Sequence, residues 1–105
     1  MIVEIIYNKQ TKVKIKQEYL ELYKKWFNDN KEVWILGRVL EAELKTTGVR
    51  KYVNKLRNIG MPIISDTKLG YKYSTNKKEL TKCYNKLRDR ALRTLSACQK
   101  MRKHL

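Results

Sequence analysis

Apolar residues in the first third of the chain recur at the three- and four-residue spacing of an amphipathic helix. The pattern is strongest between residues 17 and 28, and it stops at the polar pair Asp29-Asn30. We therefore predict a helix here that buries one face. The apolar positions on that face are Tyr19, Leu20, Tyr23, Trp26 and Phe27.

Two further helices are predicted before the middle of the chain. One covers residues 36–44 and follows a short β-type run at 32–35, and the other covers residues 47–58 and ends before Gly60. Both are expected to turn apolar side chains inward. These are Val39, Leu40 and Leu44 in the earlier helix, and Val49, Tyr52, Val53 and Leu56 in the later one.

Strands are predicted in two places. Residues 61–65 and 70–74 are short β-type runs on either side of a four-residue turn, which is typical of a hairpin. Residues 2–16 alternate in a way that predicts a second hairpin near the N-terminus. The competing interpretation extends the following helix backwards through Val13.

A long helical pattern covers residues 76–105. Asn76 or Thr75 can cap its start, where Glu79 gives a sequence similar to a capping box. The chain is thus predicted to be mainly α with a small β-hairpin (α+β), with one domain over residues 1–75 and a helical extension over residues 76–105. Apolar residues follow heptad spacing along the extension at Leu80, Tyr84, Leu87, Ala91, Thr94, Cys98, Met101 and Leu105.

Positive charge is concentrated in the C-terminal part of the chain. The formal net charge is +15, and residues 1–44 hold eight Lys/Arg against seven Asp/Glu, whereas residues 45–105 hold seventeen against three. A surface this basic favours a nucleic acid partner, because neutralising phosphates releases counterions. Lys86 is one expected sequence-independent contact. The alternative is a lysine-rich surface that is only solvated.

The residues that catalysis or cofactor binding would need are missing. There is no Walker or GxGxxG loop, no zinc-type spacing, and a single histidine, His104, near the C-terminus. We therefore predict no catalytic residues, metal or cofactor, and a binding protein rather than an enzyme. Cys83 and Cys98 lie roughly 22 Å apart along one helix, too far for a mutual disulfide. No membrane span or secretion signal is recognisable, so the expected location is the cytoplasm.

The order of helix, helix, turn, basic helix and hairpin is typical of a winged helix-turn-helix. In this fold the helix after the turn enters the major groove of DNA, with one face packed on its own domain. Side chains on the other face must hydrogen-bond with bases or phosphates. Arg50 and Lys51 match the acceptors of guanine, Asn54 matches adenine, and Lys55 or Arg57 can hold phosphates.

The same region resembles a known family. The runs G-R-V-L at 37–40, G-V-R-K-Y-V-N-K-L-R at 48–57, I-G-M-P-I-I-S at 59–65 and G-Y at 70–71 are similar to the winged helix-turn-helix of biotin-repressor-type regulators. Short proteins of temperate phages and mobile elements share this pattern and commonly add a C-terminal helix. The turn at residues 45–48 departs from the usual spacing, which leaves the first residue of the recognition helix open.

The resemblance implies that the third helix is the recognition helix and that the hairpin is the wing. It makes Arg50, Lys51, Asn54 and Lys68 the first candidates for DNA contact. The full predicted DNA-binding set is Thr47, Arg50, Lys51, Asn54, Lys55, Arg57, Lys68 and Lys72.

The C-terminal helix has two interpretations. It is either a dimerising coiled coil, which would match a palindromic DNA site, or a helix that folds back on the domain. The high charge would oppose self-association at low salt. The predicted dimer contacts are Leu80, Tyr84, Leu87, Ala91, Cys98 and Met101.

Together these features predict a regulator of transcription or replication from a phage or mobile element, which binds double-stranded DNA as a homodimer. The alternative is a phage-encoded protein that binds and inhibits a host protein or defence complex through the same scaffold. RNA binding is less favoured, because the major groove of duplex RNA is too narrow to be read by side chains.

Overall fold

The computed structural model describes residues 15–105, so the predicted N-terminal hairpin over residues 2–16 lies almost entirely outside the described residues. Helices α2 (Gln17–Asp29), α3 (Gly37–Leu44) and α4 (Val49–Asn58) come first. The strands β1 (Ile63–Asp66) and β2 (Gly70–Tyr73) and the helix α5 (Lys77–Arg102) follow them. The described part is mainly helical with one antiparallel hairpin, which confirms the predicted α+β class.

Helix α2 buries the face that its apolar spacing predicts. Leu20, Tyr23 and Phe27 are all buried. The Tyr23 ring stacks on the Tyr52 ring of α4, with 4.9 Å between the ring centroids and 15° between their planes. The Tyr23 hydroxyl shares a hydrogen bond with the Thr46 hydroxyl, and burial raises the pKa of Tyr23 above its usual value. This contact attaches the turn before α4 to the core.

Helix α3 is shorter and buries a narrower face than predicted. Leu40 is buried and Leu44 is half-buried, as expected, but the prediction for Val39 is wrong, because its side chain is 46% exposed. Helix α3 packs against α4 along the edge that carries Leu40. Val39 lies about 100° away from that residue around the helix and so faces outward.

Helix α4 begins at Val49, two residues after the predicted start. Gly48 precedes it with a φ of 79°, a conformation that favours glycine. The Glu41 carboxylate of α3 accepts a hydrogen bond of 2.9 Å from the Val49 N–H. An acidic side chain at this position satisfies an otherwise unpaired N–H and interacts favourably with the helix dipole. Helix α3 therefore fixes the point at which α4 begins.

The hairpin packs beside α4 and is held at its turn by a side chain. Ile63 of β1 pairs with Tyr73 of β2. The Asp66 carboxylate accepts hydrogen bonds from the N–H groups of Lys68 and Leu69, at 2.8 and 3.0 Å. These two bonds lower the pKa of Asp66. The turn is therefore closed by an ionised aspartate.

The short β-type run before α3 forms a single bridge rather than a strand. Ile35 and Tyr71 exchange two backbone hydrogen bonds of 2.9 and 2.8 Å, which adds this segment to the edge of the hairpin. Gly70 allows the backbone of Ile35 to come this close to the hairpin. It has a φ of 95°, and a Cβ atom at this position would lie 2.0 Å from the Ile35 carbonyl oxygen.

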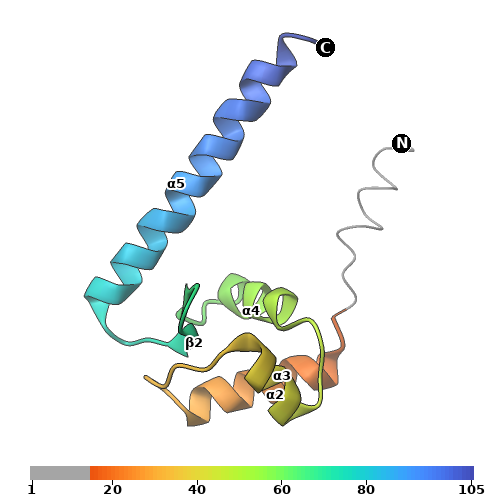
Figure 1. Cartoon of the computed structure of the whole chain (residues 1–105), viewed down its shortest axis with the longest axis vertical. Helices are drawn as coiled ribbons and strands as arrows, with labels where there is room; N and C mark the ends of the chain where they lie inside the picture. The colour runs from red at the N-terminus through yellow and green to blue at the C-terminus, as the bar shows by residue number, and fades with distance from the viewer. Residues whose placement is uncertain (1–14) are drawn as a thin grey trace.

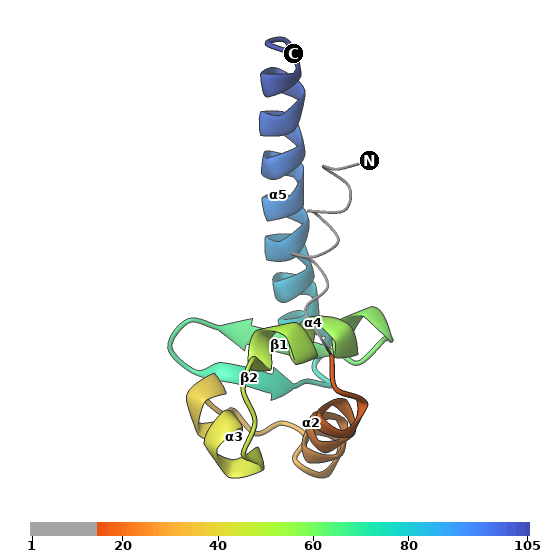
Figure 2. The same cartoon turned by 90° about the vertical axis from the view of Figure 1, so that its right-hand side faces the viewer.

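Helix α5 projects from the domain formed by the other elements (Figures 1 and 2). The Asn76 side chain caps it by accepting hydrogen bonds from the N–H groups of Lys78 and Glu79, which confirms the predicted N-cap. The first turns of α5 contact the hairpin, through β1 and through Lys72 of β2, and every residue from Tyr84 onward is exposed. Within one chain α5 does not fold back on the part of the domain formed by residues 15–73.

Candidate nucleic-acid interface

Helix α4 has a buried face and a polar face, as a helix that reads DNA requires. Tyr52, Val53 and Leu56 are buried in the core. Arg50 and Asn54, one turn apart, are exposed on the opposite side. The core therefore fixes the direction in which these two polar side chains project.

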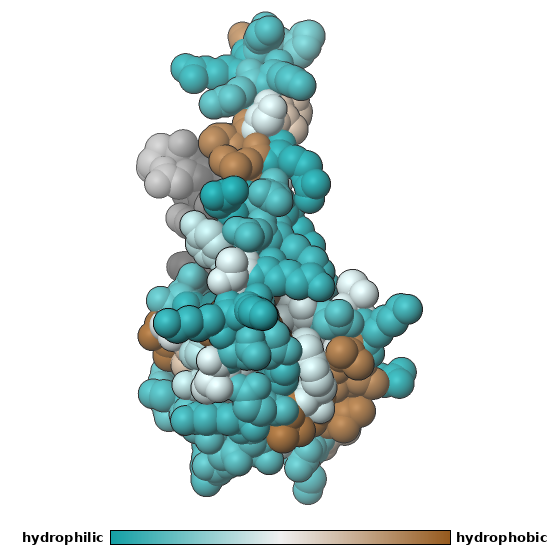
Figure 3. Space-filling view, turned by 90° about the vertical axis from the view of Figure 1, so that its left-hand side faces the viewer, coloured by the Kyte–Doolittle hydropathy of each residue, from teal (hydrophilic) through white to brown (hydrophobic). Residues whose placement is uncertain are grey.

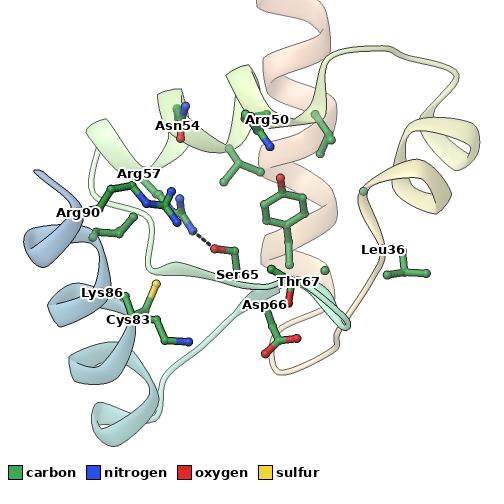
Figure 4. Close-up of a pocket in the computed structure, with 16 residues that line it drawn as sticks. Leu36, Arg50, Asn54, Arg57, Ser65, Asp66, Thr67, Cys83, Lys86 and Arg90 are labelled. Atoms are coloured by element: carbon green, nitrogen blue, oxygen red, sulfur yellow. Dashed lines mark hydrogen bonds between the residues drawn. The ribbon is translucent and has the colours of Figure 1, made fainter. Parts of the chain in front are cut away.

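A groove of about 640 Å³ runs between α4, the hairpin and α5 (Figure 4). Helix α4 lines one wall, the hairpin lines the second, and the second to fourth turns of α5 line the third. Four of the lining side chains are cationic and one, Asp66, is acidic. The polar and charged lining residues are Arg50, Asn54 and Arg57 from α4, Ser65, Asp66 and Thr67 from the hairpin, and Lys86 and Arg90 from α5.

Arg57 joins two walls of the groove. Its Nε donates a hydrogen bond of 2.7 Å to the Ile63 carbonyl, and its Nη2 donates one of 3.1 Å to the Ser65 hydroxyl (Figure 4). Arg57 was predicted to hold a phosphate. In the structure its guanidinium instead ties α4 to β1 and contributes positive charge to the groove.

Lys72 is a correction to the predicted DNA-binding set. Its side chain is only 9% exposed, and its ammonium group lies 2.7 Å from the Glu79 carboxylate and 3.8 Å from that of Glu32. It also lies 4.9 Å from the centre of the Trp34 ring. A lysine with this burial and these partners is not available to a phosphate, so Lys72 has a structural role.

The remaining predicted DNA-binding residues do not line the groove. Lys68 is exposed in the hairpin turn, and Thr47 is exposed in the turn before α4. Lys55 is exposed on α4, whereas the half-exposed Lys51 lies 5.2 Å from the centre of the Tyr52 ring. The groove therefore unites three of the eight predicted residues, Arg50, Asn54 and Arg57.

Arg90 and Cys83 were missed by the sequence prediction of this site. Both lie on α5 and line the groove with Lys86. The sequence did contain a signal, since positions 83, 86 and 90 fall on one side of a helix. The sequence could not show that this side of α5 faces the groove, because its direction depends on how the start of α5 attaches to the hairpin.

The predicted dimer residues divide into two groups. Leu80 is half-buried at the base of α5, and Leu87 lines the groove. Tyr84, Ala91, Cys98 and Met101 are exposed. The distal part of α5 also exposes Leu92 and Leu95, which the heptad pattern omitted.

No protein-family model, curated protein or solved structure matches this chain. Among residues 15–105, no helix combines the length and the apolar character that crossing a membrane requires.

Proposed function

We propose that this protein is a winged-helix DNA-binding regulator that uses α4 as its recognition helix and the hairpin as its wing. The observation that carries the proposal is the pair Arg50 and Asn54, which project one turn apart from a helix whose other face is buried. An arginine can bond the O6 and N7 atoms of guanine, and an asparagine can bond the N6 and N7 atoms of adenine. The function is recognition without chemistry.

Lysines outside the Arg50 and Asn54 pair would supply phosphate contacts that hold the protein on the duplex. Lys55 on α4 and Lys68 at the hairpin turn are both exposed. Phosphate contacts of this kind fix register and orientation but carry no sequence information directly. The proposed target is double-stranded DNA in the cytoplasm, at a site that controls transcription or replication of a phage or mobile element.

A parallel dimer through the distal part of α5 would suit this role. Leu92, Leu95 and Met101 are 53%, 54% and 68% exposed, so each offers apolar area to a second copy. Parallel helices would place both domains at the same end of the dimer. Two copies of α4 could then meet two half-sites related by the same two-fold axis.

The proposal is tested by fluorescence anisotropy with random duplex DNA and with duplexes from the genomic neighbourhood of the gene. A preference for one duplex that persists near physiological salt is expected. Replacing Arg50 and Asn54 by alanine should abolish that preference. The matched control is Lys24→Ala with Asn28→Ala, which removes the same kinds of side chain at the same spacing from α2.

The rival function is docking on a host protein. Exposed apolar side chains favour it, since Val33, Val39 and Leu69 are all 46% exposed or more, and Figure 3 shows an apolar patch on the domain below α5. If binding to every duplex is equally weak and is lost at higher salt, DNA recognition is rejected. A partner interaction that survives the loss of Arg50 and Asn54 would then support the rival.

A further inference from the structure

The start of α5 is attached to the hairpin by polar side-chain contacts. The Glu79 carboxylate accepts hydrogen bonds from the Lys72 ammonium at 2.7 Å and from the Ser74 hydroxyl at 2.8 Å. The Asn76 side chain caps the same turn. Because a helix propagates its direction, these contacts fix where the side chains of the next turns point.

Two cations on this anchored part of α5 face the groove. Lys86 and Arg90 lie about two and three turns beyond Glu79, and both line the groove opposite α4 (Figure 4). Neither forms a salt bridge with any residue between 15 and 105. The one acidic side chain in the groove, Asp66, accepts two hydrogen bonds from the hairpin turn, and the nearby Lys86 charge also lowers its pKa.

The groove therefore has an excess of positive charge on two facing walls. Arg50 and Arg57 contribute from α4, and Lys86 and Arg90 contribute from α5. A cleft lined by charges of one sign concentrates the electrostatic field and attracts an extended polyanion. If α4 occupies the major groove of a duplex and the hairpin flanks it, one sugar-phosphate strand would run along this groove.

We propose that the base of α5 is a second DNA-contacting element, in which Lys86 and Arg90 bind phosphates of the strand that lies in the groove between α4 and the hairpin. This inference rests on the proposed function. It adds a third contact surface to the recognition helix and the hairpin, and it assigns the basal turns of α5 to the duplex and the distal turns to the second copy.

The test measures how the dissociation constant for duplex DNA depends on salt. The variant Lys86→Ala with Arg90→Ala should lower the slope of log Kd against log salt by about two, since each phosphate contact contributes roughly 0.9. The preference between duplexes should stay unchanged. The control is Lys78→Ala with Lys82→Ala, which removes two cations of the same spacing from another face of α5, shared with Thr81 and Asn85.

An unchanged slope for the Lys86 and Arg90 variant would overturn the inference. An equal decrease of the slope in the Lys78 and Lys82 control would also overturn it. If Arg50 and Asn54 still determine the preference in that case, the proposed function stands without the α5 contact. A wild-type protein that shows no preference among duplexes rejects the proposed function itself. Tighter binding to a single-stranded oligonucleotide than to the duplex would also overturn the inference, because it assigns the groove to a strand of a duplex.

The two cysteines allow an independent measurement on the unmodified chain. Cys83 is half-buried in the groove, and Cys98 is exposed on distal α5. Saturating duplex DNA should slow alkylation of Cys83 several-fold more than alkylation of Cys98, as measured by mass spectrometry. Equal alkylation of Cys83 with and without DNA would contradict a strand in the groove.

Discussion

The Lys72 ammonium of β2 lies 2.7 Å from the Glu79 carboxylate of α5, and this ion pair joins the hairpin to the projecting helix. Glu32, in the segment before α3, approaches the same ammonium at 3.8 Å and accepts hydrogen bonds from the Thr75 hydroxyl and N–H. The segment before α3, about 40 residues upstream, therefore meets the hairpin and the start of α5 at one buried lysine. The orientation of α5 depends on this meeting point.

The ion pair predicts a stability that falls in acid. Hydrogen bonds from Lys72 and Ser74 lower the pKa of Glu79 below its ordinary value of 4.5, and those from Thr75 lower that of Glu32. A carboxylate with a lowered pKa in the folded state stabilises the fold above its ordinary pKa. That contribution is lost as pH falls through the folded-state pKa, because the unfolded chain takes up protons first.

We therefore expect Glu79→Gln to lower the urea midpoint at pH 7, and we expect its difference from wild type to shrink as pH falls from about 5 to 2. Glu43→Gln, on the exposed surface of α3, is the matched control and should leave the midpoint nearly unchanged at every pH. A Glu79→Gln difference that stays constant over this range would argue against the ion pair.

Gly70 and Gly60 provide a matched pair of glycine substitutions. Both have φ near 100°, so alanine at either site costs about 1–3 kcal/mol of backbone strain. At Gly60 a Cβ atom would meet nothing within 4 Å, whereas at Gly70 it would collide with the backbone of Ile35. Thermal unfolding should show a modest decrease in melting temperature for Gly60→Ala and a much larger decrease for Gly70→Ala. Equal losses would mean that the bridge to Ile35 does not form.

Thr46 is a polar residue whose removal should destabilise the core. Its hydroxyl is hydrogen-bonded to the buried Tyr23 hydroxyl, so Thr46→Val leaves that group without its partner. The expected cost is about 1–3 kcal/mol of unfolding free energy, measured by urea titration. Thr47→Val, at the exposed neighbouring position, should cost far less. Similar unfolding free energies for the two variants would show that the Thr46 hydroxyl does not stabilise the core.

The proposed parallel dimer predicts which cysteine forms a crosslink. In a parallel pair Cys98 of one copy would lie beside Cys98 of the other, within the roughly 7 Å between Cα atoms that a disulfide needs. Mild oxidation should give a covalent dimer that Cys98→Ser abolishes and Cys83→Ser retains. A monomer by light scattering at micromolar concentration, with no crosslink, would reject the dimer.

Much of the fold was predictable because local pattern and local chemistry agree. The apolar spacing of α2, the glycine that ends α4, the hairpin around Asp66 and the Asn76 cap all depend on residues within a few positions of one another. The start of α4 was less certain. It depends on Gly48 and on the carboxylate of Glu41, a residue eight positions upstream in another helix.

Contacts between distant segments explain what the sequence prediction missed. Lys72 belongs to the predicted DNA-binding set, but Glu32 and Trp34 cover it from a segment about 40 residues away. Arg57 was predicted to bind a phosphate, and in the structure its Nε donates a hydrogen bond to the Ile63 carbonyl of β1. The tertiary contacts show that the Lys72 ammonium is already paired, whereas Arg57 keeps part of its guanidinium in the groove.

The unbroken course of α5 links the groove at its base to the apolar surface near its end. Each residue of a helix adds about 100° of rotation and 1.5 Å of length. One alanine inserted after Arg90 would swing the distal apolar side chains by about a quarter of a turn relative to α4, whereas four would nearly restore their direction and move them about 6 Å outward. The length of this helix would therefore set both the angle and the separation of two paired copies, independently of the residues that face the bases.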